Sequence, residues 1–193
     1  MKYVSDIVTN TLEIKQSKFI SYLLSYTLYK DTLSSLKEQH PKARHFVVAY
    51  RYLNEYNQIV EYSSDDGEPK GTSGKPTLMV LQGTNLINSA IITIRYFGGT
   101  KLGTGGLVRA YSDATNLVIN KAELMEYKDE IFKTIVFSYS DIGKVEYECS
   151  KNAINIVNKE FLNAAKFEIK ATKESLEIFF TKLSRIITEV SLT

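Results

Sequence analysis

The stretch Asn88–Asp113, NSAIITIRYFGGTKLGTGGLVRAYSD, decides how the rest of the chain is interpreted. Its apolar run over 90–97 is typical of a strand buried on both faces, and therefore central in a sheet. Five glycines follow within nine residues, and an apolar stripe at helical spacing then predicts a helix. A strand, a glycine-rich turn and a helix start together form a layout in which backbone N–H groups can bind an anion.

The glycine loop over 98–106 matches neither of the common nucleotide-binding patterns. No Gly-Lys-Ser/Thr closes it as in a Walker A motif, and Val108 stands where a GxGxxG pattern needs glycine. Two interpretations remain open: a site for a phosphate of RNA or of a nucleotide, and a structural turn that needs positive φ angles. The candidate phosphate contacts are the loop's cations and glycines together with one strand histidine: Arg95, Lys101, Gly103, Gly105, Gly106, Arg109 and His45.

A second loop, over 63–76, is acidic at its start and contains no large apolar residue, so it is expected on the surface. Its carboxylates Asp65, Asp66 and Glu68 could bind a hard cation such as Mg²⁺, dock a basic partner, or belong to a solvated turn. Because their charge is opposite to that of the glycine loop, we expect the two loops to face each other across one cleft. They could then hold each other rather than a ligand.

Catalytic signatures are weak. The chain has two histidines and one cysteine, which form neither a zinc signature nor a recognisable nucleophilic triad. His45 could be a base, a phosphate contact or a hydrogen-bonded strand residue, and Cys149 is expected in a core. Whether the chain is an enzyme is therefore left undecided, catalytic residues are unknown, and no cofactor or metal is expected apart from the Mg²⁺ interpretation.

Composition narrows the class of protein. A chain of 193 residues with 44% hydrophobic residues can build a real core. Its net charge of +2 gives no general indication of nucleic-acid binding, so any basic surface patch that binds nucleic acid must be local. No DNA specificity is expected. The sequence shows no secretory signal and no apolar run of membrane-spanning length, and one cysteine fits a reducing compartment. A cytoplasmic protein without a membrane partner is expected, and its oligomeric state is unknown.

Periodicity predicts an α+β chain of two domains, 1–126 and 127–193. In the first, two strands within 10–28 meet at a turn over 16–18, and a short helix runs from an Asp31 cap to Pro41. The other expected elements are a hairpin of 45–52 and 59–62, a helix from Pro76 to Gly83, the strand over 90–97 and the helix after the glycine loop. A charged linker over 123–129 precedes a βαββα unit of ferredoxin-like type, whose elements are expected at 131–139, 141–151, 154–157, 166–171 and 174–188, with a last short strand over 189–192.

Taken together, these stretches resemble the YigZ/IMPACT family. Three motifs carry the resemblance: A-x-H-x-x-x-A-Y-R from Ala43, S-D-D-G-E-P-x-G-T-x-G-x-P from Ser64, and R-Y-F-G-G-x-K-L-G-x-G-G-L-x-R-A-Y from Arg95. The resemblance implies a first domain similar to the second domain of the small-subunit ribosomal protein five, a left-handed β-α-β arrangement. It implies a second domain similar to the last domain of elongation factor G. The chain departs from the family pattern at Val47, where cysteine is frequent, and at Ser73, where alanine is usual.

The resemblance also bears on function. Eukaryotic IMPACT-type proteins regulate translation, whereas bacterial members have no settled activity, and the peptidase label that some carry finds no support in these residues. We therefore expect a translation-associated regulatory protein that binds RNA, the ribosome or a translation factor in the cleft of the glycine loop. The alternative is an enzyme or binder of a phosphorylated small molecule or nucleotide in the same cleft.

Overall fold

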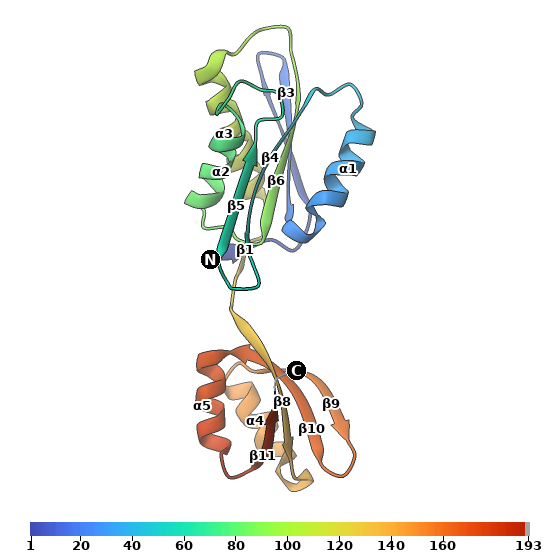
Figure 1. Ribbon diagram of the computed structural model, residues 1–193, viewed down its shortest axis with the longest axis vertical. Coiled ribbons are helices and arrows are strands. Elements are labelled where there is room, and N and C mark those ends of the chain that lie inside the picture. Colours follow the sequence, from blue (N-terminus) through green and yellow to red (C-terminus); the bar gives the residue numbers. More distant parts are fainter. Residues whose placement is uncertain (192–193) are drawn as a thin grey trace. The chain divides into compact units, whose positions relative to one another are not determined.

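The isoleucine-rich stretch forms β6 (Ser89–Tyr96), the central strand of a five-stranded sheet in the computed structural model of the chain. The structure describes residues 1–191, which form two compact units, one over Met1–Tyr127 and one that starts at Lys128 (Figure 1). All but the last residue of β6 are buried, which confirms that this strand is covered on both faces.

Neighbouring strands of the first sheet are all antiparallel, in the order β2-β3-β6-β4-β5. Its other strands are β2 (Val8–Ile14), β3 (Ser17–Ser25), β4 (His45–Leu53) and β5 (Ile59–Ser64). The predicted hairpin is β4 with β5. Because β5 and β6 both run antiparallel to β4, they are parallel to each other, and α2 (Gly74–Gly83) connects them in a β-α-β unit.

Helices cover both faces of this sheet (Figure 1). α2 and the predicted helix after the glycine loop, α3 (Gly103–Lys121), pack on one face, and α1 (Tyr29–Gln39) lies on the other. Successive residues of β6 divide between the two cores: Ile91 packs in one cluster with Val118 of α3, and Ile92 packs in another with Leu36 of α1. No helix within residues 1–191 is both long and apolar enough to cross a membrane.

The β2–β3 turn and the start of α1 were predicted wrongly. The turn between β2 and β3 is made by Lys15 and Gln16, both at positive φ, and Ser17 already pairs with Ile14. Neither turn residue is a typical turn former, which is why the turn was expected one residue later. α1 begins at Tyr29 rather than after an Asp31 cap, because a 3₁₀ turn leads directly into it, and Asp31 lies within its first turn.

The second unit is a ferredoxin-like βαββαβ fold, as predicted. Its four strands are antiparallel in the order β11-β8-β10-β9, and two helices complete it. The elements are β8 (Glu130–Phe137), α4 (Ile142–Lys151), β9 (Asn155–Phe161), β10 (Ala165–Thr172), α5 (Lys173–Leu183) and β11 (Ile187–Ser191), with a 3₁₀ turn at Tyr139–Asp141. The helix predicted over 174–188 is too long, since its last residues belong to β11, and residue 192 of the last predicted strand lies outside the described residues.

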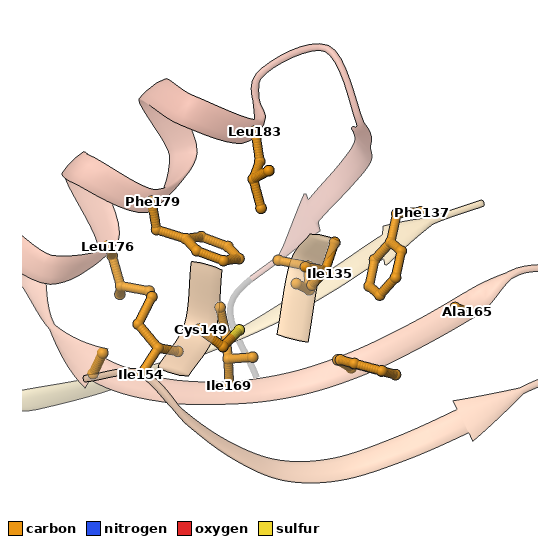
Figure 2. Packing of buried hydrophobic residues seen from close by; sticks show 12 residues of the cluster. Ile135, Phe137, Cys149, Ile154, Ala165, Ile169, Leu176, Phe179 and Leu183 are labelled. Atoms are coloured by element: carbon orange, nitrogen blue, oxygen red, sulfur yellow. The ribbon is translucent and has the colours of Figure 1, made fainter. Parts of the chain in front are cut away.

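The core of this unit lies between its sheet and its helices (Figure 2). Cys149 of α4 is buried among Ile154, Leu176 and Phe179, as expected of a core residue. Burial raises the pKa of the Cys149 thiol to about 11, so the side chain is a neutral apolar group at physiological pH.

The charged segment expected as a linker contains a short strand. Within it, β7 (Met125–Glu126) pairs antiparallel with β1 (Lys2–Tyr3), so the end of the first unit is held to its beginning. The backbone N–H of Tyr127 also donates to the carbonyl of Met1. The contacts divide the chain between Tyr127 and Lys128.

Candidate functional site

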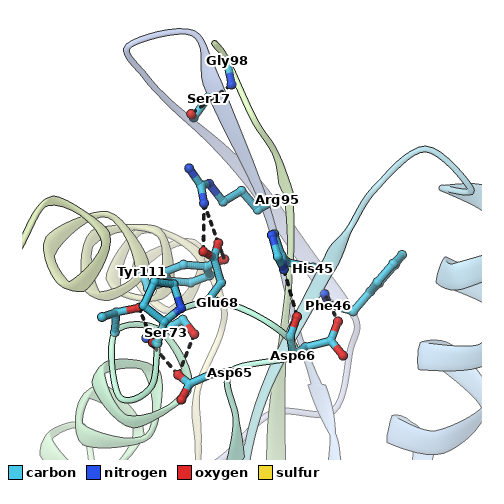
Figure 3. Close-up of polar contacts among 12 residues, drawn as sticks. Ser17, His45, Phe46, Asp65, Asp66, Glu68, Ser73, Arg95, Gly98 and Tyr111 are labelled. Carbon is cyan, nitrogen blue, oxygen red and sulfur yellow. Dashed lines mark hydrogen bonds and ion pairs between the residues drawn. The ribbon is translucent and has the colours of Figure 1, made fainter. Parts of the chain in front are cut away.

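The antiparallel register of β4 and β6 places the first of the three sequence motifs beside the third. His45, the first residue of β4, is the direct partner of Arg95 near the end of β6. The acidic loop leaves the neighbouring strand β5 and reaches the same end of the sheet, so that His45, Glu68 and Arg95 lie together (Figure 3). Residues from three separate stretches of sequence therefore form one site.

A buried ion pair joins the acidic loop to β6. Arg95 Nη1 lies 2.7 Å from Oε1 and 2.9 Å from Oε2 of Glu68, with 7% and 3% of the two side chains exposed (Figure 3). The hydroxyl of Tyr111 on α3 donates to Oε1 of Glu68 at 2.8 Å. Burial, and secondly the negative charge of Glu68, raises the pKa of Tyr111 well above its usual value, so the phenol remains a donor. Opposite charges of two motifs thus hold each other.

Asp65 and Asp66 fix the shape of the acidic loop. Asp65 accepts hydrogen bonds from the backbone of Gly71, Ser73 and Gly74 and from the Ser73 hydroxyl, and so caps the start of α2 from outside the helix. Burial would raise the pKa of Asp65, but these donors outweigh burial and hold the pKa below its usual range. The Asp66 carboxylate accepts from the backbone N–H of Phe46 at 2.6 Å.

These contacts bear on the Mg²⁺ interpretation of the acidic loop. All three carboxylates already accept hydrogen bonds from the protein. Within residues 1–191, no group of three or more His, Cys, Asp or Glu side chains is arranged to hold a metal ion. In the structure, the three carboxylates therefore hold the loop to its neighbours.

The Arg95 guanidinium is compensated in charge but not fully in hydrogen bonding. Its Cζ lies 5.6 Å from the ring centre of buried Phe19 and 5.8 Å from that of Phe97. Its Nε is buried and has no hydrogen-bond partner in the protein, as far as residues 1–191 are concerned. A buried N–H without an acceptor is costly, and a ligand oxygen is one of the ways in which it can be satisfied.

Two cavities flank Arg95 and share Phe97, a residue that is 57% exposed. The first has a volume of about 400 Å³ and is polar; its lining residues are Lys42, Arg44, His45, Arg95, Tyr96 and Phe97. The second has a volume of about 360 Å³ and more apolar walls; its lining residues are Glu68, Pro69, Arg95, Phe97, Lys101, Leu102, Gly103, Thr104 and Leu107.

The electrostatic character of the cavities follows from their linings. Four cations face one carboxylate, which gives a net charge of +3 with histidine neutral, whereas the whole chain carries +2. Arg95 neutralises Glu68, and three exposed cations, Lys42, Arg44 and Lys101, form no ion pair within the described part of the chain. We call this surface, formed by the linings of both cavities, the cationic groove.

The glycine loop has both structural and open positions. Gly99 and Gly103 adopt positive φ angles of +86° and +74°. A Cβ on Gly98 would lie 2.0 Å from the backbone of Gln16, so this glycine allows the end of β6 to pass close to the β2–β3 turn. In contrast, a Cβ on Gly105 would meet nothing within 4 Å, so no described contact requires glycine there. The structural interpretation of the loop therefore explains some of its glycines and leaves Gly105 unexplained.

The N-terminus of α3 lies beside the second cavity, and its backbone N–H groups have no side-chain cap among the described residues. Its capping position is Leu102, no side chain within residues 1–191 caps it, and its first turn has no acidic residue. Gly103 and Thr104 are exposed and line the cavity. Helix N-termini leave backbone N–H groups without intrahelical partners and favour anions. Gly106, in the same turn, is tightly packed against the Leu102 side chain.

The remaining predicted residue, Arg109, is exposed on α3 and is absent from the described lining of both cavities. Sequence reasoning missed Lys42, Arg44 and Phe97. A signal was available for the first two, because both lie within three residues before His45 and no acidic residue stands between Glu38 and Glu55. Phe97 was expected inside the strand, but β6 ends one residue earlier and leaves its ring in solvent.

Comparison with known proteins finds two family models along the chain. The family model described as the Impact N-terminal domain matches residues 15–119, and one described as a domain of unknown function (DUF1949) matches residues 135–186. An IMPACT family member of Haemophilus influenzae is 33% identical over 178 residues, which cover 89% of this chain and 85% of the relative. The IMPACT family member YigZ of Escherichia coli is 32% identical over 188 residues, which cover 92% of this chain and 88% of that relative.

A crystal structure of a hypothetical protein is 29% identical, covers 95% of this chain and 91% of its own, and superposes with a TM-score of 0.64. The two-domain translational regulator Yih1 matches at 19% identity over 62% of this chain and 46% of its own, with a TM-score of 0.34, a likeness too low to bear on fold or function. Since the Impact N-terminal domain covers more than half of the sequence and relatives match along nearly all of it, the chain belongs to the IMPACT family.

Proposed function

We propose that this chain binds single-stranded RNA in the cationic groove, as part of a regulatory role in translation. The observation that carries the RNA proposal is the position of Phe97, an exposed aromatic ring between two cationic cavities. Proteins that bind single strands combine cations along the backbone path with aromatic rings on which bases stack. The link to translation rests on the family resemblance, since eukaryotic IMPACT-type proteins regulate translation.

Phosphate contacts are supplied by separate parts of the groove. Lys42 and Arg44 border the first cavity, whereas Lys101 and the start of α3 border the second. Arg95 contributes less net charge because Glu68 neutralises it, but its guanidinium lies 5.8 Å from the ring centre of Phe97 and so helps to shape the groove. Successive phosphates of one strand can then reach both cavities while a base lies on Phe97.

Fluorescence anisotropy with a labelled oligouridine, measured from 50 to 200 mM salt, tests the RNA proposal. Each phosphate neutralised on a single strand contributes about −0.7 to the slope of log K against log salt, so three free cations predict a slope of about −2. Lys101→Ala should reduce the slope by about 0.7. The matched control is Lys30→Ala, because Lys30 is an exposed lysine on α1, away from the groove. A slope near zero, or equal effects of the two variants, would overturn the proposal.

Co-sedimentation with ribosomal subunits tests the translation-associated part. Wild type and Lys30→Glu should co-sediment at low salt, and Lys101→Glu should not. Equal recovery of all three proteins would count against a ribosomal role of the groove.

A second candidate function is binding of a phosphorylated small molecule or nucleotide. The second cavity favours it: about 360 Å³ lies within the size range of small-molecule sites, and apolar walls meet a helix N-terminus there. Competition separates the two proposals. If uridine monophosphate, with or without Mg²⁺, displaces the oligonucleotide at micromolar concentration, the nucleotide is the ligand. Displacement only by longer single strands supports RNA.

A further inference from the structure

The histidine of the first motif has a fixed tautomer. His45 Nδ1 lies 2.9 Å from the backbone carbonyl oxygen of Asp66 (Figure 3). A carbonyl oxygen can only accept, so Nδ1 must carry the proton and donate. In the neutral ring, Nε2 is then an acceptor with a free lone pair.

The acidic loop also holds the His45 ring in place. Gly67, at a φ of +84°, lies so close that a Cβ on it would be 3.4 Å from Nδ1. The Asp66 carboxylate points away from the ring, toward the backbone N–H of Phe46 (Figure 3). The ring is thus oriented by the loop backbone and faces no carboxylate of that residue.

The first cavity is otherwise lined by donors. Lys42, Arg44 and Arg95 contribute ammonium and guanidinium groups, which cannot accept a hydrogen bond. The Tyr96 hydroxyl is engaged at 2.9 Å with Nδ1 of His40. Among the described residues of this lining, His45 Nε2 is therefore the side-chain acceptor without a partner.

The first cavity, in which His45 Nε2 is an acceptor among cationic donors, is poorly suited to a phosphate group alone. Phosphate oxygens need donors, and a neutral imidazole nitrogen has a lone pair that repels them. The acceptor suits a ligand in which a hydroxyl lies next to a phosphate. In a nucleic-acid strand, that group is the ribose 2′-hydroxyl, the group by which a protein can distinguish RNA from DNA.

Resting on the proposed function, we infer that His45 selects RNA over DNA in the cationic groove by accepting a hydrogen bond from a ribose 2′-hydroxyl at Nε2. The phosphate next to that ribose lies against Lys42 and Arg44 in the same cavity. Phe97 and Lys101 bind either kind of strand, since stacking and phosphate contacts do not depend on the sugar. His45 is thus a specificity-determining residue, and the cations supply affinity.

The test compares oligouridine, oligodeoxyuridine and 2′-fluoro-oligouridine of equal length on the full chain at one salt concentration. One hydrogen bond of ordinary strength predicts that oligouridine binds about fivefold more tightly than oligodeoxyuridine. The 2′-fluoro strand keeps an RNA-like sugar but has no hydroxyl donor, so it should bind like DNA. If the 2′-fluoro strand binds like RNA, the groove selects sugar shape and the inference fails.

Two variants locate the effect. His45→Asn places an amide donor near the position of Nδ1 and lacks Nε2. The ratio of the affinity for RNA to the affinity for DNA should therefore fall to about one, through weaker RNA binding at unchanged DNA binding. His45→Gln places an acceptor near Nε2 and should keep part of the preference. Equal weakening of RNA and DNA by His45→Asn, with an unchanged ratio, would show that His45 only supports the loop and would overturn the inference.

The two proposals fail in different ways. If neither oligouridine nor oligodeoxyuridine binds at 50 mM salt, the proposed function fails and the inference fails with it. If the wild-type protein binds oligouridine and oligodeoxyuridine with the same affinity, the groove is a nucleic-acid site without sugar selection, and the inference alone is overturned.

Discussion

Replacing Glu68 by glutamine removes the negative charge that faces Arg95 and keeps the size of the side chain. Both side chains are more than nine-tenths buried, so the arginine would be left as an uncompensated charge out of contact with water. Breaking a buried pair by removing one partner costs about 3–5 kcal/mol. Glutamine keeps one oxygen that can accept from Arg95 or Tyr111, so we expect a loss near the lower limit, about 3 kcal/mol.

Native-state hydrogen exchange measured by mass spectrometry on the full chain is the appropriate assay. Peptides from β4 and β6 report the free energy of unfolding of the first unit, and peptides from β8 and β10 serve as an internal reference that should not change. Glu61→Gln is the matched control, because Glu61 pairs with Arg51 in the same unit but is 31% exposed. Arg51 is buried like Arg95, but it also donates to the carbonyl oxygens of Leu81 and Leu86 and keeps these partners, so the change should cost about 1 kcal/mol.

A double variant sharpens this test. Adding Arg95→Met to Glu68→Gln removes the orphaned charge, so the pair of changes should cost less than the sum of the single changes. Equal losses for Glu68→Gln and Glu61→Gln, or additive losses in the double variant, would refute the view that this ion pair ties the acidic loop to the sheet.

Three further predictions concern the loops. Asp65→Ala should destabilise the first unit by about 2 kcal/mol at pH 7, because α2 loses its cap. Since folding lowers the pKa of Asp65, the difference in stability from wild type should persist above about pH 4 and shrink as the pH falls further. Urea unfolding measures this difference, and a difference that does not change with pH would contradict the reasoning. Gly98→Ala should cost about 2 kcal/mol or more, because its Cβ would meet backbone at 2.0 Å; an unchanged melting temperature would refute that reasoning. Gly105→Ala should stabilise α3 by about 0.5 kcal/mol, measurable as a higher urea midpoint, whereas a loss of stability would reveal a constraint absent from the described contacts.

Strong periodic patterns made the central elements predictable. Consecutive isoleucines favour a strand covered on both faces, and the stripe that includes Leu107, Ala110 and Tyr111 favours a helix with one buried face. The β2–β3 turn was misplaced for the opposite reason: Lys15 and Gln16 adopt positive φ angles that their residue types do not favour.

The site was predictable in its members but not in its pairings. Charge complementarity indicated that the acidic and glycine loops face each other, yet it could not say that Glu68, rather than Asp65 or Asp66, meets Arg95. That choice depends on the register of β4 with β6 and on the cap that Asp65 forms on α2, and both are contacts between distant parts of the chain. The exposure of Phe97 depends on where β6 ends, and strand ends are poorly defined by alternation alone.

The structure also offers an aromatic surface that competes with the proposed one. Tyr26 stacks on Tyr52 at 4.1 Å, and Tyr50 stacks on Tyr62 at 5.0 Å. These rings mainly face one another, and none of the four lines the cationic groove. Cross-strand packing accounts for them, but base stacking on this cluster is a clear alternative to stacking on Phe97.

Photo-crosslinking of a 4-thiouridine-containing oligouridine to the full chain, with the modified peptide located by mass spectrometry, tests the central claim most directly. Our account predicts crosslinks in the peptide that contains Phe97 and their loss in Phe97→Ala. Crosslinks confined to the tyrosine cluster or to residues after Lys128, with none near Phe97, would contradict it.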